Sequence, residues 1–352
     1  MDKKQQQRVA LVAGASGIVG SQLVNTLLRN QWEVIGLSRH ALSHSDGIPM
    51  VNVDLLDAQD SARVLPSLSG ITHIFYSAWL NAVNWTEMVE PNVAMLRNLV
   101  SNVENAAPLQ TVSLMQGYKV YGAHLGPFKT PARESDPGVP GAEFNAAQLA
   151  WLSDFQRGKP WHWNAIRPGV VGSTVPGNAM NLALCIALYA SLCKALNLPL
   201  RFPGSEQTWQ SIVDHTDAGL LAEATLWAAT SPAAENQAFN VNNGDIWRWN
   251  ELWPRIARWF ALETAPPVRL SFHQLFKDYR PVWRELAAQQ RLVESDILQL
   301  NDGQFADFVF GWHYDMFGDG SKLRRAGFTA MQATDEMFFS LFEQLRAARI
   351  IP

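Results

Sequence analysis

The stretch Gly14-Ala15-Ser16-Gly17-Ile18-Val19-Gly20 decides the fold. It directly follows a short apolar run at residues 9–13, and the first periodic helical segment begins inside it. Gly14 permits a tight turn, Gly17 lets the backbone approach a pyrophosphate, and Gly20 brings the helix close to the strand. Free N–H groups at the start of the helix attract an anion, although an ordinary turn can contain the same glycines. The residues expected to bind a nucleotide are Gly14, Ser16, Gly17, Ile18, Val19 and Gly20.

Beyond this loop, short apolar runs rich in β-branched residues alternate with longer periodic segments as far as Ile166. This alternation predicts an α/β fold, with βαβ units around a parallel sheet. After the loop, Ile18, Leu23 and Leu27 fall on one face of a helix that ends near Asn30. The expected strands are residues 9–13, 33–37, 50–53, 72–76, 111–115 and 162–166.

The chain beyond Arg167 has a mainly helical pattern, with helices expected at 179–196, 217–229, 249–262 and 331–348. Turns that contain Pro or Gly separate these segments, and no flexible linker divides the two halves. We therefore expect two regions that share a cleft. The predicted division is a nucleotide-binding domain at 1–172, with 213–243 packing back onto it, and a substrate-binding region at 173–212 and 244–352.

Composition excludes several classes of function. The 352 residues carry 28 Lys and Arg against 32 Asp and Glu, so there is no broad basic surface for nucleic acid. No uncharged apolar run approaches the roughly 20 residues that span a bilayer, so we expect a soluble protein without a membrane partner. Cys185 and Cys193 lie in an apolar stretch typical of buried thiols, which suits a reducing cytoplasm. The histidines are not grouped at metal-ligand spacing, and we expect no metal site.

The end of the second expected strand indicates which dinucleotide binds. An NAD site usually places an acid there, but this chain has Ser38-Arg39-His40. Glu33 begins the same strand, about 17 Å away at ~3.3 Å per residue. Arg39 can bind a 2′-phosphate, worth roughly 1.5–3 kcal/mol, which favours NADP(H), although it could also be a solvated loop charge. Residues expected either to flank the adenine or to form a simple turn are Asp54 and Leu55.

Further motifs are distributed over nearly the whole chain. They are Gly-Leu-Ser-Arg at 36–39, Ile-Phe-Tyr-Ser-Ala-Trp at 74–79, Asn-Val-Ala-Met-Leu-Arg-Asn at 92–98, Gln-Gly-Tyr-Lys-Val-Tyr-Gly at 116–122, Arg-Pro-Gly at 167–169, Ala-Phe-Asn-Val-Asn-Asn-Gly-Asp at 238–245 and Ile-Ile-Pro at 350–352. With the glycine loop, the chain resembles the short-chain dehydrogenase/reductase family, in its progesterone 5β-reductase and iridoid synthase-like branch. Many reductases share the glycine loop, whereas the 116–122 stretch is particular to this branch.

The resemblance implies an extended Rossmann fold: a parallel sheet flanked by helices, with a smaller, mainly helical C-terminal substrate region. It also implies NADPH as hydride donor, and related reductases are often homodimers. Trp79 could equally belong to the core, and an ordinary Pro-Gly turn explains residues 168–170 nearly as well. The residues that the resemblance places around the pyrophosphate, ribose and nicotinamide are Ser77, Ala78, Trp79, Gln116, Lys119, Pro168, Gly169 and Val170.

The resemblance also implies a catalytic pair, of which this chain keeps one member. In the family, a lysine at the position of Lys119 and a tyrosine on the following helix hold the substrate carbonyl oxygen. Residues 143–146 here read Glu-Phe-Asn-Ala where the family has Asn-Phe-Tyr-Tyr, so the tyrosine is absent. Lys119 could stabilise an oxyanion, hold the nicotinamide ribose or be a surface lysine. The candidates to replace the phenol are Asn145, whose amide donates but is not an acid, and Tyr121, which could also simply pack near the loop.

The missing phenol favours one reaction type. A plain ketone would give an alkoxide that needs a proton at once, whereas a delocalised enolate is less basic and can be quenched by water. The leading hypothesis is therefore NADPH-dependent 1,4-reduction of a small apolar enone or enal, with the lysine assisting. Three alternatives stay open: an aldehyde or ketone reductase, a sugar-nucleotide-type epimerase or dehydratase, and a non-catalytic NADPH-binding redox sensor.

Overall fold

The computed structural model describes residues 8–39, 47–139 and 143–352, which form two compact units. Unit 1 contains the described residues up to Pro168 together with 219–241 and 319–329, and unit 2 contains 169–218, 242–318 and 330–352. The sequence placed 319–329 in the substrate region, but this segment belongs to unit 1. Two hydrogen bonds explain the difference: the Asp319 amide donates to the Ala132 carbonyl at 2.8 Å, and Lys322 Nζ donates to the Ala238 carbonyl at 2.9 Å.

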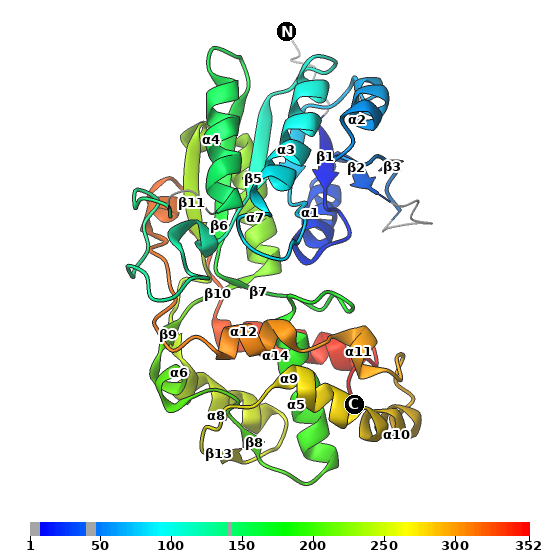
Figure 1. Ribbon diagram of the computed structural model, residues 1–352, viewed down its shortest axis with the longest axis vertical. Helices are drawn as coiled ribbons and strands as arrows, with labels where there is room; N and C mark the ends of the chain where they lie inside the picture. Colours follow the sequence, from blue (N-terminus) through cyan, green and yellow to red (C-terminus); the bar gives the residue numbers. More distant parts are fainter. Residues whose placement is uncertain (1–7, 40–46, 140–142) are drawn as a thin grey trace. The chain divides into compact units, whose positions relative to one another are not determined.

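Unit 1 is built on a seven-stranded parallel sheet in the order β11-β6-β5-β4-β1-β2-β3 (Figure 1). All six predicted strands are confirmed: β1 and β5 have the predicted ends, and one end of each of the others moves by one or two residues. The seventh strand, β11, was not predicted because its sequence, Gln-Ala-Phe-Asn-Val, holds a single β-branched residue. It pairs with β6 from Gln237 opposite Asn164 to Val241 opposite Pro168. The strands are β1 (Val9–Ala13), β2 (Glu33–Ser38), β3 (Met50–Asn52), β4 (His73–Tyr76), β5 (Thr111–Met115), β6 (His162–Pro168) and β11 (Gln237–Val241).

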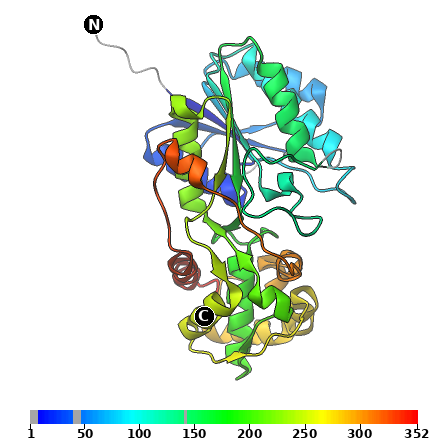
Figure 2. The same cartoon turned by 90° about the vertical axis from the view of Figure 1, so that its left-hand side faces the viewer.

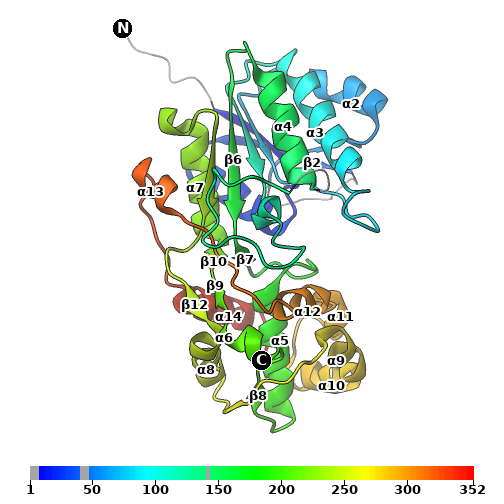
Figure 3. The same cartoon turned by 60° about the vertical axis from the view of Figure 1, so that its left-hand side comes forward.

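Helices cover both faces of this sheet (Figure 2, Figure 3). Alternate residues of β1 point to opposite faces, so that Val12 belongs to one hydrophobic core and Leu11 to the other. The Val12 core includes Leu23 of α1 (Ile18–Arg29) and Ala222 of α7 (Ala218–Thr230). The Leu11 core is built by the helices on the other face: α2 (Ala58–Val64), α3 (Val89–Glu104) and α4 (Phe144–Gln156).

The strand order creates a switch point beside β1. The chain runs from β1 to β2 and β3 on one side, and then returns to β4 on the other side of β1. In open α/β sheets, ligands bind at such a point, outside the carboxyl ends of the strands. The glycine loop follows β1 and Ser77 follows β4, so the sheet brings both segments to this edge.

Unit 2 is mainly helical, as predicted, and its strands form two-stranded pairs. Its core contains Phe202, Trp249, Trp253 and Phe310, whose ring centroids lie between 5.1 and 6.2 Å apart. The free thiols Cys185 and Cys193 are buried on α5, as predicted. The helices of unit 2 are α5 (Leu182–Ala195), α6 (Glu206–Gln210), α8 (Trp249–Trp259), α9 (Phe272–Asp278), α10 (Arg280–Gln290), α11 (Ile297–Leu300), α12 (Gln304–Phe310) and α14 (Thr334–Ala347), and α13 (Ser321–Arg325) belongs to unit 1.

The strand pairs of unit 2 are β7 (Val170–Gly172) with β10 (His215–Asp217), β8 (Leu200–Arg201) with β13 (Thr264–Ala265), and β9 (Ile212–Val213) with β12 (Trp247–Arg248). The four predicted helices are confirmed as α5, α7, α8 and α14; α7 is shifted by one residue and the other three are shorter than predicted. α5 starts three residues late because the Asn181 side chain accepts from the Leu184 amide at 3.1 Å and caps the helix. Within the described residues, no helix is long and apolar enough to cross a membrane.

Candidate active site

The glycine loop between β1 and α1 has the geometry that its sequence predicts. Gly14 has a φ of 84°, and the Gly17 amide donates to the Gly14 carbonyl at 3.0 Å, which closes the turn. A Cβ on Gly20 would lie 2.0 Å from the Gly14 carbonyl oxygen, so only glycine lets the helix approach the loop. Gly14 and Gly20 are therefore required by local geometry, whereas any residue other than proline could make the amide bond of Gly17.

The start of α1 suits a phosphate group. Gly17 is the N-cap residue, and no side chain caps the helix. The amide groups of the first turn are consequently left for a ligand, at the positive end of the helix dipole. Ser16 is exposed beside them, whereas the Ile18 side chain is buried in the core. The residues present fit a dinucleotide pyrophosphate.

The carboxyl end of β2 carries a cation and no acid. Ser38 ends the strand and Arg39 follows it as an exposed residue, while Glu33 lies at the opposite end of the same strand. His40 lies outside the described residues. Asp54 forms a turn, because its Oδ1 accepts from the Leu56 amide at 2.9 Å. Leu55 is buried, and its carbonyl accepts from Asn98 Nδ2 at 2.8 Å.

The segment after β4 packs directly on the glycine loop. Ser77 Oγ donates to the Ala13 carbonyl at 2.9 Å. A Cβ on Gly14 would lie 2.9 Å from Ser77 Oγ and 3.0 Å from the Ala78 amide nitrogen, so the two segments are in close contact. Trp79 follows with 38% of its surface exposed. The structure thus brings the predicted residues 77–79 to the carboxyl edge of the sheet, where the glycine loop lies.

Lys119 lies in the 3-10 turn η2 (Tyr118–Tyr121), four residues beyond the end of β5. Its Nζ is 4.6 Å from the ring centre of Trp85 and 5.6 Å from that of Trp79. Within the described part of the chain, this ammonium has no hydrogen bond and no ion pair. Burial lowers the pKa of Lys119, and the charge of Glu143 partly opposes this. A partly desolvated ammonium beside two indole faces can accept an oxygen ligand.

Asn145 lies in the first turn of α4 and is tied to a buried acid. Glu143 caps the helix by accepting from the Ala146 amide at 2.9 Å, and Asn145 Nδ2 donates to the other Glu143 oxygen at 2.7 Å. Burial raises the pKa of Glu143, with the hydrogen bonds and Lys119 opposing the shift. Gln116 Nε2 donates to the Asn145 carbonyl at 2.6 Å. The Asn145 amide group therefore already has an acceptor within the protein.

Tyr121 belongs to a buried network that reaches Asn145 through Arg167 and Gln116. Its hydroxyl donates to Asn240 Oδ1 at 2.7 Å and accepts from Arg167 Nη1 at 2.9 Å. Arg167 Nε also donates to Gln116 Oε1 at 2.9 Å. Burial raises the pKa of Tyr121 to about 12. While the bond to Asn240 holds, the phenol has no proton to give to a substrate, so this geometry favours a structural role for Tyr121 over the expected catalytic one.

The predicted Pro168-Gly169-Val170 stretch falls at the division between the units. Pro168 ends β6 in unit 1, whereas Gly169 and Val170 belong to unit 2. The Gly169 amide donates to Thr216 Oγ1 at 3.0 Å, and a Cβ here would lie 2.4 Å from Asp214 Oδ1. Close packing within unit 2 is thus enough to explain why position 169 is a glycine. The role of the three residues beneath a nicotinamide stays a prediction.

Comparison with known proteins identifies the family. Residues 40–352 match the family described as a PRISE-like Rossmann-fold domain. The chain belongs to this family. It is 31% identical to 3-oxo-Delta(4,5)-steroid 5-beta-reductase of Arabidopsis thaliana, with 98% of this chain and 94% of that protein covered. It is 30% identical to (S)-8-oxocitronellyl enol synthase of Catharanthus roseus, with 99% and 94% covered.

The family resemblance inferred from the sequence is thereby confirmed. The fold also matches the crystal structure of Thermus thermophilus UDP-glucose 4-epimerase in complex with NAD, at a TM-score of 0.66. The two chains are 20% identical, and the match covers 97% of this chain and 99% of the other. This PRISE-like chain therefore has the extended short-chain dehydrogenase/reductase fold that its sequence predicts.

Sequence reasoning missed two side chains that surround Lys119. Trp85 lies in a mostly polar stretch before α3, where no motif marks it. His124 lies just beyond the 116–122 motif, and its ring centre is 4.3 Å from that of Trp85. The one available signal for His124 was its position two residues after Gly122, in the loop that the lysine motif opens. Glu143 is the first residue of the 143–146 stretch that differs from the family, but the sequence predicted no role for it.

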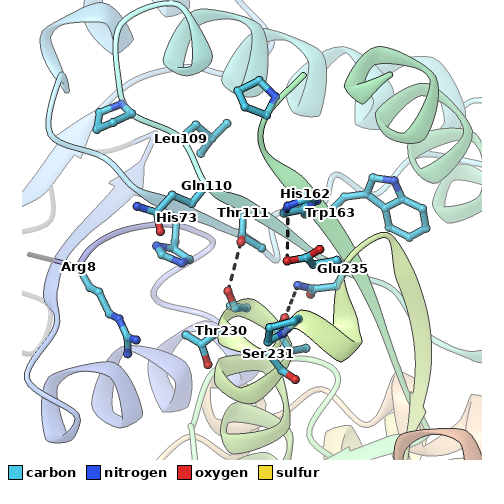
Figure 4. A pocket seen from close by; sticks show the side chains of 16 residues that line it. Arg8, His73, Leu109, Gln110, Thr111, His162, Trp163, Thr230, Ser231 and Glu235 are labelled. Atoms are coloured by element: carbon cyan, nitrogen blue, oxygen red, sulfur yellow. Dashed lines mark hydrogen bonds and ion pairs between the residues drawn. The ribbon is translucent and has the colours of Figure 1, made fainter. Parts of the chain in front are cut away.

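A pocket of about 530 Å³ lies at the opposite, amino edge of the sheet (Figure 4). Thr111 and His162, the first residues of β5 and β6, line it together with Glu235 and the end of α7. Thr111 Oγ1 donates to the Ala229 carbonyl at 3.2 Å, and His162 Nε2 is 3.5 Å from Glu235 Oε1. None of the predicted site residues lines this pocket. The candidate active site is at the carboxyl edge.

Proposed function

We propose that this member of the PRISE-like family is an NADPH-dependent reductase of a C=C bond conjugated to a carbonyl. One observation carries the proposal: the Lys119 ammonium lies 4.6 Å and 5.6 Å from two indole rings and has no hydrogen-bond partner within the described residues. The flanking rings of Trp85 and Trp79 suit a small apolar substrate. The names of the two relatives, a steroid 5-beta-reductase and an enol synthase, support the same reaction class.

The cofactor assignment rests on the loop after β1 and on Arg39. The uncapped start of α1 would hold the pyrophosphate, and the exposed Arg39 guanidinium would bind a 2′-phosphate. Ser77, Ala78 and Gln116 lie at the same edge of the sheet and would complete the nucleotide site. When bound, the reduced nicotinamide supplies a hydride to the β-carbon of the substrate.

Lys119 would stabilise the charge that this transfer creates. As the new C–H bond forms, the π electrons of the C=C bond shift toward the carbonyl and leave an enolate. The ammonium donates to the enolate oxygen, and one such preorganised donor is worth about 2.7–4 kcal/mol. A water molecule then gives a proton to the α-carbon, which completes the reduced product. The charge of Glu143 favours the ammonium form that this role requires.

The surrounding hydrogen bonds favour this reaction over reduction of a plain carbonyl. An alkoxide needs a proton immediately. The Tyr121 proton is donated to Asn240, and the Asn145 amide is donated to Glu143, so neither side chain is placed as an acid. An enolate tolerates that arrangement because it is less basic.

The test is NADPH oxidation with a panel of small enones and enals, using NADPH deuterated at C4. We expect deuterium on the β-carbon of the product. Deuterium on the former carbonyl carbon would instead identify an aldehyde or ketone reductase. Tight NADPH binding without turnover of any compound would overturn the proposal and favour a redox sensor.

We also propose that the protein works in the cytoplasm, because Cys185 and Cys193 are free thiols, as is usual for cysteines of a reducing compartment. A homodimer is proposed from the family resemblance. Light scattering on the purified protein would test it, and a mass near 39.2 kDa would refute it.

A further inference from the structure

His124 shares the indole of Trp85 with Lys119. The imidazole meets the Trp85 ring edge to face, with centroids 4.3 Å apart and planes at 62°. The Lys119 ammonium lies 4.6 Å from the centre of the same ring. The charge of Lys119 also acts on the protonation of His124, so the two polar groups belong to one cluster.

The loop that carries His124 has a defined path. Gly122 and Gly126 flank it with φ angles of 86° and 139°, values that only glycine adopts readily. A Cβ on Gly122 would lie 2.6 Å from Val139 Cγ2, so the start of the loop packs tightly. These features define the backbone path of the loop that carries the imidazole.

Both ring nitrogens of His124 are buried and have no hydrogen-bond partner within the described residues. Other histidines of the chain differ: His73 Nδ1 is 2.8 Å from Thr72 Oγ1, and His273 Nδ1 is 2.8 Å from the Asp302 carbonyl. A buried polar group without a partner costs free energy unless something else supplies the bond. Unlike the unpartnered His215, which is packed among Trp249 and Phe338 in unit 2, His124 stands next to the candidate catalytic lysine.

His124 is neutral at neutral pH. Burial, together with the charge of Lys119, lowers its pKa to about 4. A neutral imidazole has one N–H donor and one acceptor. Triosephosphate isomerase shows that a neutral histidine can polarise a carbonyl as a hydrogen-bond donor.

We propose that the neutral imidazole of His124 donates the second hydrogen bond to the substrate carbonyl oxygen, beside Lys119, in place of the phenol that this chain lacks. This inference rests on the proposed function and extends it. The imidazole keeps its proton throughout: its N–H bond to the oxygen strengthens as the enolate charge develops, and the α-carbon is still protonated by water. His124 is thus a catalytic residue that acts by donation without proton transfer.

The kinetic test compares His124→Phe with His124→Gln. Phe keeps the ring and removes the donor, so kcat for enone reduction should fall roughly 10²–10³-fold. The KM for NADPH should not change, because His124 is not part of the glycine loop. Gln restores a donor and should recover most of the lost rate. His124→Leu is a second variant without a donor, should His124→Phe fold poorly, and His162→Phe, at the opposite edge of the sheet, is the matched control.

A binding measurement tests His124 independently of turnover. In the complex with oxidised cofactor, calorimetry compares the affinity of 2-cyclohexenone with that of cyclohexene, which lacks the oxygen. We expect the unmodified protein to prefer the enone, and His124→Phe to reduce this preference about tenfold, as loss of one hydrogen bond to a polarised group predicts. An unchanged preference together with an unchanged kcat would overturn the inference. Lack of turnover in the unmodified protein would refute the proposed function, while the preference would still decide the role of His124.

Discussion

Unit 1 holds two partly or fully buried cations near the carboxyl ends of neighbouring strands, and they have opposite surroundings. Arg167, on β6, donates to Gln116 and Tyr121, so its charge is held by hydrogen bonds within the protein. Lys119, beyond β5, faces two indole rings without a hydrogen bond to any residue that the structure describes. Burial costs free energy for both groups. Among the described residues, hydrogen bonds offset this cost for Arg167, whereas Lys119 has the two rings and the charge of Glu143.

This difference separates a structural cation from one kept for a ligand. A cation that donates hydrogen bonds to other parts of the chain stabilises the fold and is less available to a ligand. A cation without partners destabilises the free protein slightly and gains its hydrogen bond when substrate charge develops. Loss of Arg167 should therefore affect stability first, and loss of Lys119 should affect rate first.

The largest expected effect is on the rate of Lys119→Met. Removing the ammonium should lower kcat for enone reduction roughly 10²–10³-fold, because one oxyanion donor is lost. The melting temperature should stay the same or rise, since a buried charge without a hydrogen bond is removed. Steady-state kinetics and thermal unfolding check both parts. Lys129→Met, which changes an exposed lysine, is the control. A clear loss of stability in Lys119→Met would show that Lys119, like Arg167, has a structural role.

Arg167→Leu should show the reverse pattern. It leaves Gln116 Oε1 and the Tyr121 hydroxyl without their donor, and unpaired buried groups cost about 1–3 kcal/mol each. We expect urea unfolding to show a loss of roughly 2–4 kcal/mol. Arg157→Leu, at an exposed ion pair, should cost less than about 1 kcal/mol. Equal stabilities of the two variants would contradict the structural role of Arg167.

Arg39 is a third cation of unit 1 and, unlike the other two, it is exposed. It should act on cofactor choice, with little effect on kcat or folding. Arg39→Glu should lower the preference for NADPH over NADH roughly 10–100-fold, since a charge-assisted bond to the 2′-phosphate is lost. The ratio of kcat/KM values for the two cofactors measures this, and an unchanged ratio would show that Arg39 is only a solvated charge.

The smallest effect is a pH dependence that distinguishes the two buried cations. Burial lowers the pKa of Lys119, so its ammonium should be lost at a pH below the ordinary lysine value, and kcat should fall there. Over the same range the unfolded chain binds more protons at this lysine than the folded chain, so its contribution to stability rises with pH. The difference in unfolding free energy between the unmodified protein and Lys119→Met isolates this contribution. A rate that stays flat up to the ordinary lysine pKa would argue against the ammonium.

The sequence alone predicted most of the framework. The glycine loop, six of the seven strands of the parallel sheet and the helical second half follow local rules, because turn glycines and apolar periodicity act between neighbours in the chain. The position of Lys119 after a strand also followed from sequence order. The sequence does not predict the strand β11, because its residues have little intrinsic preference for a strand and it forms by pairing with β6.

Only the tertiary structure decided what the polar side chains near Lys119 are bonded to. Tyr121 and Asn145 were equal candidates from the sequence, yet the Tyr121 proton goes to Asn240, 119 positions away, and the Asn145 amide goes to Glu143. Trp85 lies beside the Lys119 ammonium and His124 packs on the same indole, although neither residue belongs to the motif that contains the lysine. The physical reason is that a hydrogen bond or ring contact depends on distances of a few ångströms between atoms. Those distances are set only when the whole sheet has formed.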